Sequence, residues 1–425
     1  MSLSPTDPRK AVITGVGVVC PLGAGRDEFW QALDANRSGV ETMRHTYARE
    51  LPVRFAGEVR DFEAKKYVKP RKSLKVMSRD IQHGMAAAAM AMDDAALSPT
   101  NLDPTRFGVV LGAEMLYCVA EELDRAFGTC IEEGQFDFPT WGKDALGEMN
   151  PLWLLKYLPN MTACHIGISV DARGPNNSIT HGDVSSAMAI GEAQRLIERG
   201  AADVIITGGS GSRVSISMLS YRSDKNWSHR EDDPAGACRP FDANRDGVVN
   251  GEGAGILILE SRQHAEARGA NILATILDSR SGFEPRGKGG PFKGTAIRNS
   301  IRAVLSDADE SRNGVGFVSA NGLSTRIDDR VEAQAIQETL GDVPVTAFKS
   351  RMGDIGAGSG AVEMIAAVLA LTHRKVPATL NYTTPDPECP VQVIAGSPLD
   401  LQTPIALCLS QSMMGQATAT LLAAP

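Results

Sequence analysis

The chain has 425 residues, of which 43% are hydrophobic and 22% are charged, and a formal net charge of −8. A chain of this length and ordinary composition can bury a sizeable core, which favours two domains or one large duplicated unit. The negative charge argues against general nucleic-acid binding. The seven cysteines show no CxxC or CxxxC spacing, which indicates free thiols in a reducing compartment rather than a disulfide framework or a zinc site.

The N-terminal segment lacks the apolar core that is typical of a signal peptide. No apolar run reaches the roughly 18–20 residues of a membrane span. We therefore expect a cytoplasmic protein that has no membrane segment.

Apolar segments along the chain predict strands that alternate with helices. In chain order, the predicted strands are 11–19, 107–111, 204–207, 254–259, 317–320, 343–347 and 405–410. The predicted helices are 27–36, 82–97, 183–199, 262–268, 295–307, 329–340 and 360–371. This alternation predicts an α/β fold with covered sheets. A break near Ser261 divides the chain into residues 1–260 and 261–425.

Residues 174–191 predict a strand that runs into a buried helix, with Asp183 at the junction. An α/β enzyme often holds its nucleophile at such a turn, because the side chain projects beside the free N–H groups of the helix. Here the junction holds a carboxylate instead of a thiol or hydroxyl. Asp183 can cap the helix or take part in chemistry, and the sequence leaves both roles open.

Several ordered motifs carry a resemblance to a known family. They are Val12-Ile13-Thr14-Gly15-Val16-Gly17 with Pro21-Leu22-Gly23, Arg239-Pro240-Phe241-Asp242 with Gly251-Glu252-Gly253-Ala254-Gly255, and Lys349-Ser350 with Gly360-Ala361-Val362-Glu363. From residue 10 to the end, the chain resembles the β-ketoacyl-acyl-carrier-protein synthases, especially the type II elongating enzymes of fatty acid and polyketide synthesis. The resemblance implies an α/β thiolase fold with two similar halves, five alternating layers and usually a dimer. Residues 1–260 would form the N-terminal half and residues 261–425 the C-terminal half.

The resemblance also implies which positions would carry the chemistry. The family uses a cysteine thiolate to accept an acyl chain from acyl carrier protein, and two histidines to decarboxylate a malonyl thioester and stabilise the enolate. In this sequence Asp183 stands at the cysteine position, and Asn321 and Asp354 stand at the two histidine positions. Lys349 and Glu363 match the family, and we expect them to form a buried ion pair or hydrogen bond.

A gating loop and a docking surface are implied by the same resemblance. The family's C-terminal glycine-phenylalanine-glycine loop is replaced by Ser412, Met413 and Met414, followed by Gly415. A basic run without acidic residues suits an acidic partner, and in the family this region resembles the docking surface for acyl carrier protein. Its members are Lys65, Lys66, Lys69, Arg71, Lys72, Lys75 and Arg79. An ordinary solvated helix face is the other interpretation of this run.

Three further patterns are weighed as candidate sites. Residues 162–165 contain Cys164 and His165 but match a family position that is not catalytic. Residues 242–247 resemble the start of a calcium loop, yet the twelfth position is Gly253 rather than glutamate. Asp183 and Asp354 should converge, with Asn321 and His181 as candidate neighbours, and such a set could act as an acid–base pair or hold a hard metal ion.

Together these patterns predict a family member that has lost condensation activity, since an acyl group on Asp183 would be an unstable mixed anhydride. It would act in fatty acid or polyketide synthesis with acyl carrier protein as partner, either as a homodimer or paired with an active ketosynthase, as chain-length-factor subunits are. The alternative is a hydrolase or lyase that acts on acyl thioesters through Asp183 and Asp354. No cofactor and no metal are assigned.

Overall fold

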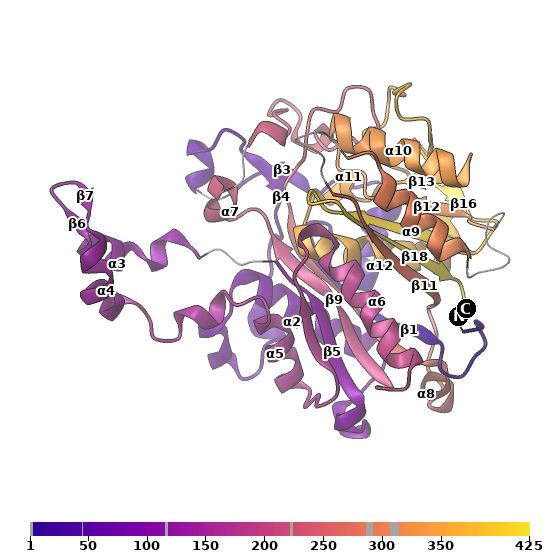
Figure 1. Cartoon of the computed structure of the whole chain (residues 1–425), viewed down its shortest axis with the longest axis horizontal. Helices are drawn as coiled ribbons and strands as arrows, with labels where there is room; N and C mark the ends of the chain where they lie inside the picture. Colours follow the sequence, from indigo (N-terminus) through magenta and orange to yellow (C-terminus); the bar gives the residue numbers. More distant parts are fainter. Residues whose placement is uncertain (1–2, 45, 115–117, 222–223, 286–291, 307–313) are drawn as a thin grey trace.

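The computed structural model describes residues 3–44, 46–114, 118–221, 224–285, 292–306 and 314–425. Within these residues a 12-stranded mixed sheet passes through the body of the molecule (Figure 1). The sheet consists of two halves that share one strand order, three parallel strands followed by two antiparallel ones.

The first half of the sheet is built from the N-terminal part of the chain. Its strands, in spatial order, are β8 (Asn176–Ile179), β5 (Phe107–Gly112), β9 (Val204–Ser212), β10 (Glu252–Ser261) and β1 (Ala11–Cys20). β1 is buried along its whole length, as expected for a near-continuous apolar strand that is covered on both faces.

The second half mirrors this order. Its strands are β11 (Ala274–Phe283), β18 (Gln416–Ala423), β17 (Ile405–Gln411), β12 (Phe317–Ser319), β13 (Pro344–Thr346) and the outer strand β15 (Gln392–Val393). The two halves join where Val12 and Ile13 of β1 pair with Thr275 and Ala274 of β11.

Helices cover both faces of each half. α2 (Arg79–Asp94) and α5 (Met161–Ser169) pack on the outer face of the first half, and α9 (Thr295–Ser306) and α10 (Arg326–Leu340) cover the second. α6 (Ser185–Glu198) and α12 (Ser359–His373) lie between the halves and contact strands of both (Figure 1). The result is the five-layered α/β thiolase arrangement that the sequence predicts.

α12 is apolar nearly all round because it lies in the middle layer. The stretch Gly356–His373 is long and apolar enough to cross a membrane, but 89% of it is buried inside the protein. This apolar stretch is longer than the predicted helix 360–371. Packing between two half-sheets accounts for its apolar composition.

The remaining regular elements are short and lie around this frame. They are β2 (Gly23–Ala24), α1 (Arg26–Asp34), β3 (Val40–Thr42), β4 (Phe55–Gly57), α7 (Ile216–Tyr221), α8 (Arg262–Ala267), α11 (Lys349–Met352), β14 (Lys375–Val376) and β16 (Leu399–Asp400).

One segment projects away from the body of the molecule (Figure 1). It contains α3 (Asp124–Thr129), the hairpin of β6 (Ile131–Glu132) and β7 (Gln135–Phe136), and α4 (Phe138–Lys143). We call residues 119–150 the arm. The arm has a small core of its own, in which Trp141 and Met149 pack against the buried side chains of Ala126, Cys130 and Ala145.

Candidate functional site

Asp183 lies in a short 3₁₀ turn, Gly182–Val184, between β8 and α6. It is 7% exposed, and its carboxylate forms an ion pair with Arg213. Val184 is the N-cap residue of α6 and makes no side-chain capping bond. The N-cap position that the sequence suggested for Asp183 is therefore taken by Val184, and Asp183 forms an ion pair instead of standing at the cap.

Arg213 is the residue that sequence reasoning missed. It follows β9, its side chain is 2% exposed, and it pairs with Asp183, with Asp354, and with Glu114 at 3.3 Å. The strands β8, β5 and β9 are parallel neighbours, so the segments after them meet at one edge of the sheet. Glu114, Asp183 and Arg213 each come just after one of these strands. This placement is the feature of the sequence that could have indicated a charged cluster.

Asp354 lies between α11 and α12 and uses both carboxylate oxygens. One oxygen pairs with Arg213. The other accepts hydrogen bonds from Ser359 Oγ at 3.0 Å and from the Gly356 amide at 3.2 Å. Asp354 is 2% exposed, so these contacts are shielded from water.

The charge of Arg213 is strongly favoured by this setting. Burial opposes the cation, but the carboxylates of Asp183, Asp354 and Glu114 outweigh burial and raise the pKa of Arg213 well above its ordinary value. Arg213 therefore stays protonated and pairs with carboxylates at two of the three positions that the family resemblance marks as catalytic.

The absence of a side chain at Gly356 allows Arg213 to pack closely against the backbone there. Gly356 has φ 75°, and a Cβ placed there would overlap Glu114 Oε2 and lie 2.7 Å from Arg213 Nε. A residue without a side chain is therefore needed at this turn, both for the left-handed backbone and for the close approach of the guanidinium.

Asn321 is held by a second buried cluster. Lys349 Nζ donates to the main-chain oxygen and to Oδ1 of Asn321, both at 3.0 Å, and lies 2.5 Å from Glu363 Oε1. The Asn321 and Gly322 amides donate to Glu332 at 2.8 and 2.9 Å. The expected contact between Lys349 and Glu363 is present.

Lys349 remains a cation in this cluster. Burial acts against its charge, but Glu363, Asp354 and Glu332 together raise the pKa of Lys349 above its ordinary value. Because Asn321 Oδ1 accepts from this cation, the orientation of the amide is fixed, and its Nδ2 group is the part that can still donate a hydrogen bond.

The strand β17 brings the two clusters together. Ser410 Oγ donates to the Asp183 main-chain oxygen at 3.4 Å. The backbone amide of the next residue, Gln411, donates to Asn321 Oδ1 at 3.4 Å. Asp183, Asn321 and Asp354 therefore gather in one region, as the sequence predicts. The side chain of His181 is exposed, unlike the buried side chains of these three residues.

The loop that would gate the site connects β17 and β18. Met413 and Met414 are 38% and 65% exposed. Met414 Cε approaches to 3.8 Å from the position that a Cβ on Gly182 would occupy, so the loop lies over the turn that holds Asp183. Gly415 has φ 97° and takes a backbone conformation that suits glycine.

Space beside Asn321 and the loop is small. A cavity of about 30 Å³ is lined by Asn321, Gln411, Met413 and Gly415, among others, and has room for about one water molecule. In the part of the chain that the structure describes, no group of three or more His, Cys, Asp or Glu side chains is arranged to hold a metal ion. Arg213 lies where a cation between Asp183 and Asp354 would lie.

Two of the candidate sites considered from the sequence, residues 242–247 and 162–165, make local contacts within the protein. Asp242 accepts from the amides of Asn244, Thr383 and Thr384 at 2.7–2.8 Å, so its carboxylate ties two loops together. Cys164 lies on α5, where Asn160 Nδ2 approaches its sulfur at 3.5 Å.

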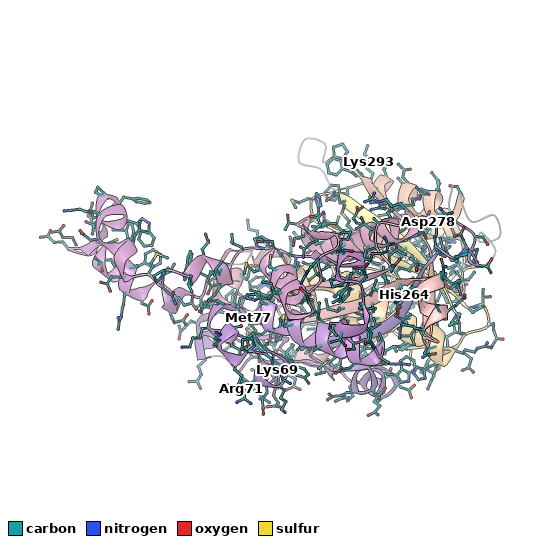
Figure 2. The ribbon with its side chains drawn as sticks, turned by 90° about the horizontal axis from the view of Figure 1, so that it is seen from below. Lys69, Arg71, Met77, His264, Asp278 and Lys293 are labelled. Atoms are coloured by element: carbon teal, nitrogen blue, oxygen red, sulfur yellow. The ribbon has the colours of Figure 1, made fainter. Side chains whose placement is uncertain are left out.

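The basic run is largely a surface feature. Lys69 and Arg71 lie at one edge of the molecule (Figure 2), and all seven members of the run are exposed. Arg79 differs from the others because it forms an ion pair with buried Glu252 at 2.7 Å. We call the other six residues the basic patch: Lys65, Lys66, Lys69, Arg71, Lys72 and Lys75.

Comparison with known proteins places this architecture in a family. Residues 9–265 match the profile of the beta-ketoacyl synthase N-terminal domain, and residues 273–383 match that of the C-terminal domain. The chain is 32% identical to 3-oxoacyl-[acyl-carrier-protein] synthase 2 of Synechocystis sp., over 94% of each chain. It is also 32% identical to the granaticin polyketide putative beta-ketoacyl synthase 1 of Streptomyces violaceoruber, over 98% of this chain and 99% of that one.

Solved structures agree with the sequence relatives. The ishigamide ketosynthase/chain length factor is similar, with a TM-score of 0.85, 27% identity and coverage of 98% of this chain and 99% of that chain. A type II polyketide acyl-carrier protein in complex with its ketosynthase matches with a TM-score of 0.82 and 29% identity, over 99% of this chain and 100% of that one. The chain therefore belongs to the β-ketoacyl synthase family.

Proposed function

We propose that this chain is a member of the ketosynthase family that does not condense acyl groups by itself. The observation that carries the proposal is the ion pairing of Arg213 with both Asp183 and Asp354. Asp183, which the resemblance aligns with the family's nucleophile, is already paired with a buried guanidinium. An acyl group transferred to Asp183 from a thioester would form a less stable mixed anhydride.

The decarboxylation step lacks its usual groups as well. The enolate needs a donor directed toward the developing negative charge. Asn321 can donate from its Nδ2 group, but Asp354 carries a negative charge that would repel the enolate. Asn321 cannot shuttle a proton as a histidine does, and the Asp354 carboxylate is held by Arg213.

We propose that the chain works as a partner of an active ketosynthase in fatty acid or polyketide synthesis. The support is the similarity over almost the whole chain to a structure described as a ketosynthase/chain length factor. The basic patch would bind the acidic acyl carrier protein that delivers the acyl group to the active subunit.

The contacts of Arg213 weigh against altered hydrolase or lyase chemistry through Asp183 and Asp354. A general base needs a carboxylate that is free to take a proton, and both of these are held by the same cation.

The test is an elongation assay with purified chain, acyl carrier protein loaded with an acyl group, and malonyl carrier protein. We expect no elongated product from the chain alone, and product when a ketosynthase that retains its cysteine and two histidines is added. That ketosynthase assayed without this chain is the control. If the chain alone elongates the acyl group and Asp183→Ala abolishes the product, the proposal is wrong.

A further inference from the structure

We propose that a cavity at the base of the arm is a binding site for a small organic cation, one with a primary ammonium group on a short apolar chain. Binding of such a cation requires neither condensation nor a partner subunit, so this site stands apart from the proposed function. The cavity is also separate from the small one beside Asn321, because no described residue lines both.

The cavity has a volume of about 330 Å³, which lies within the range of roughly 300–1,000 Å³ that is typical of small-molecule sites. It is formed where the start of α2, the end of β9 and the base of the arm meet. Met77, one of its lining residues, lies on the side of the body from which the arm projects (Figure 2).

Part of the lining is apolar. Met77, Val214 and Met218 line the cavity and are themselves buried, and Ile216 and Val119 add further apolar surface. A short hydrocarbon chain placed there would be removed from water, which is favourable by about 25 cal/mol per Å² of apolar surface. Methionine side chains adapt readily to the shape of such a chain.

The charged side chains of the lining are mostly acidic. They comprise five carboxylates and two cations: Asp80, Glu114, Glu121, Glu122 and Glu252 against Arg79 and Lys156. The arm reinforces this imbalance, since residues 119–150 contain eight acidic and two basic side chains. The electrostatic potential in this region therefore attracts cations.

Both cations of the lining already have carboxylate partners. Arg79 pairs with Glu252 at 2.7 Å, and Lys156 pairs with Glu122 at 2.6 Å. Among the residues that the structure describes, Asp80 forms no ion pair. The negative charge of the cavity is therefore only partly balanced by the protein itself.

Asp80 shows the cost of this imbalance. Its Oδ1 is shielded from solvent and accepts no hydrogen bond from the described residues. Burial, together with the nearby carboxylates of Glu252 and Glu114, raises the pKa of Asp80 to about 7. A cation in the cavity would stabilise the ionised form of Asp80, because it would supply the counter-charge that the lining lacks.

The combination of apolar and acidic lining favours an alkylammonium ion over other ligands. An ammonium group offers three N–H donors to the carboxylates, and its hydrocarbon chain suits the apolar lining. A neutral chain would leave Asp80 without a counter-charge, and an anion would be repelled. A metal ion needs several oxygen ligands at about 2–2.6 Å, and the described residues contain no group of three or more His, Cys, Asp or Glu side chains arranged for one.

The experiment measures the binding of three probes of equal chain length to the full chain by isothermal titration calorimetry. The probes are hexylammonium chloride, hexan-1-ol and sodium hexanoate. We expect hexylammonium to bind with one-to-one stoichiometry and about 10-fold or more tighter than hexanol, as a hydrogen bond to a charged group predicts. Hexanoate should bind more weakly than both.

Asp80→Asn should weaken hexylammonium binding about 10-fold and leave hexanol binding unchanged. The variant removes a poorly compensated charge at nearly constant volume, so the protein should keep its fold, which its melting temperature checks. Asp400→Asn removes the same charge from an exposed position outside the cavity and should leave both Kd values unchanged. Glu121→Gln, at an exposed position in the lining, should also weaken hexylammonium binding and decides the outcome if Asp80→Asn does not fold.

Proton release gives a second readout. The charged groups that act on Asp80 are Arg79 on α2, Glu252 on β10 and Glu114 after β5. Since the pKa of Asp80 is about 7 and a primary amine stays protonated at this pH, hexylammonium should displace a fraction of a proton at pH 7. Titration in two buffers with different ionisation enthalpies detects this release, and Asp80→Asn should abolish it.

Three results would overturn the proposal. They are an absence of saturable hexylammonium binding, binding of hexanol or hexanoate as tight as that of hexylammonium, and equal Kd values for wild type and folded Asp80→Asn. The second result would make the cavity a site for apolar chains, and the third would place the bound cation elsewhere. None of these results bears on the elongation assay, so the cation site can fail while the proposed function stands.

Discussion

The guanidinium of Arg213 faces carboxylates from three segments of the chain that are distant in sequence. Its side chain is 2% exposed, so the charges around it interact with little screening by water. Removal of one member of such a buried group leaves the others without a counter-charge. Arg213 therefore determines both the electrostatics and the stability of this region.

Arg213→Met should lower the free energy of unfolding by about 3–5 kcal/mol, because Asp183 and Asp354 would remain buried without their cation. Urea unfolding measures the loss. Arg173→Met is the control, since Arg173 and Asp171 form an exposed pair with side chains that are 66% and 60% exposed, and such pairs contribute about 0–1 kcal/mol.

A rescue variant tests whether uncompensated carboxylates cause the loss of stability in Arg213→Met. Asp183→Asn and Asp354→Asn, added to Arg213→Met, remove the uncompensated charges and should recover part of the stability. A loss in Arg213→Met no larger than that in Arg173→Met would contradict the interpretation.

The sequence was sufficient to place Asp183, Asn321 and Asp354 in one region, because the motifs around them keep the family's order. It was not sufficient to find Arg213 or Glu114. Both follow glycine-containing strand ends that resemble ordinary loops, and their role depends on which strands are neighbours in the sheet. The order of strands in a sheet is a property of the tertiary structure, and a local sequence pattern does not reveal it.

At the scale of elements, the turn before α12 depends on Gly356. Gly356→Ala should destabilise the protein through two effects, a backbone at φ 75° and a Cβ that overlaps Glu114 and crowds Arg213. Gly200→Ala separates the two effects, since Gly200 has nearly the same φ, 76°, with nothing within 4 Å of the added Cβ.

Denaturant unfolding of both glycine variants gives the comparison. Gly200→Ala should cost about 1–2 kcal/mol from the left-handed backbone alone, and Gly356→Ala should cost clearly more. Equal losses would show that crowding at Arg213 contributes nothing.

α2 contains a buried histidine that should make stability depend on pH. Burial lowers the pKa of His83 to about 4, and neither ring nitrogen has a hydrogen-bond partner among the described residues. The unfolded chain binds a proton near pH 6.5 while the folded protein does not, so stability falls as the pH drops from about 6.5 to 4.

His83→Leu removes this proton uptake. The difference in unfolding free energy between wild type and His83→Leu should shift by about 3 kcal/mol between pH 7 and pH 4, in the direction that disfavours the wild type in acid. Parallel pH curves for the two proteins would show that His83 is accessible to protons in the folded state.

The long elements were predictable because their apolar patterns extend over several turns or strand residues. The predicted helix 82–97 corresponds to α2 (Arg79–Asp94), and the strand 254–259 lies inside β10. The arm was not predicted, because α3 and α4 have six residues each and some of their large apolar side chains, Phe127 and Phe138, are exposed. A pattern of buried faces cannot reveal a segment that is mostly exposed.

At the scale of the whole molecule, charge is unevenly distributed, with the acidic arm and the basic patch on one chain. Lys69→Glu combined with Arg71→Glu should weaken the binding of acyl carrier protein about 10-fold at low salt, because rim charges mainly steer association. Arg173→Glu combined with Arg199→Glu changes the net charge equally at exposed positions outside the patch.

Titration of acyl carrier protein at low and high salt checks this prediction. The patch variant should lose affinity and salt dependence, and the control should keep both. If the two variants bind equally weakly, net charge rather than the patch governs association.

The mirrored strand order of the two half-sheets has a consequence for folding. α6 and α12 each contact strands of both halves, so one half alone would leave its central helix facing water. Neither half can therefore complete its core without the other. Asp183 and Arg213 come from one half and Asp354 from the other, so the ion pair between Arg213 and Asp354 forms only when both halves are in place.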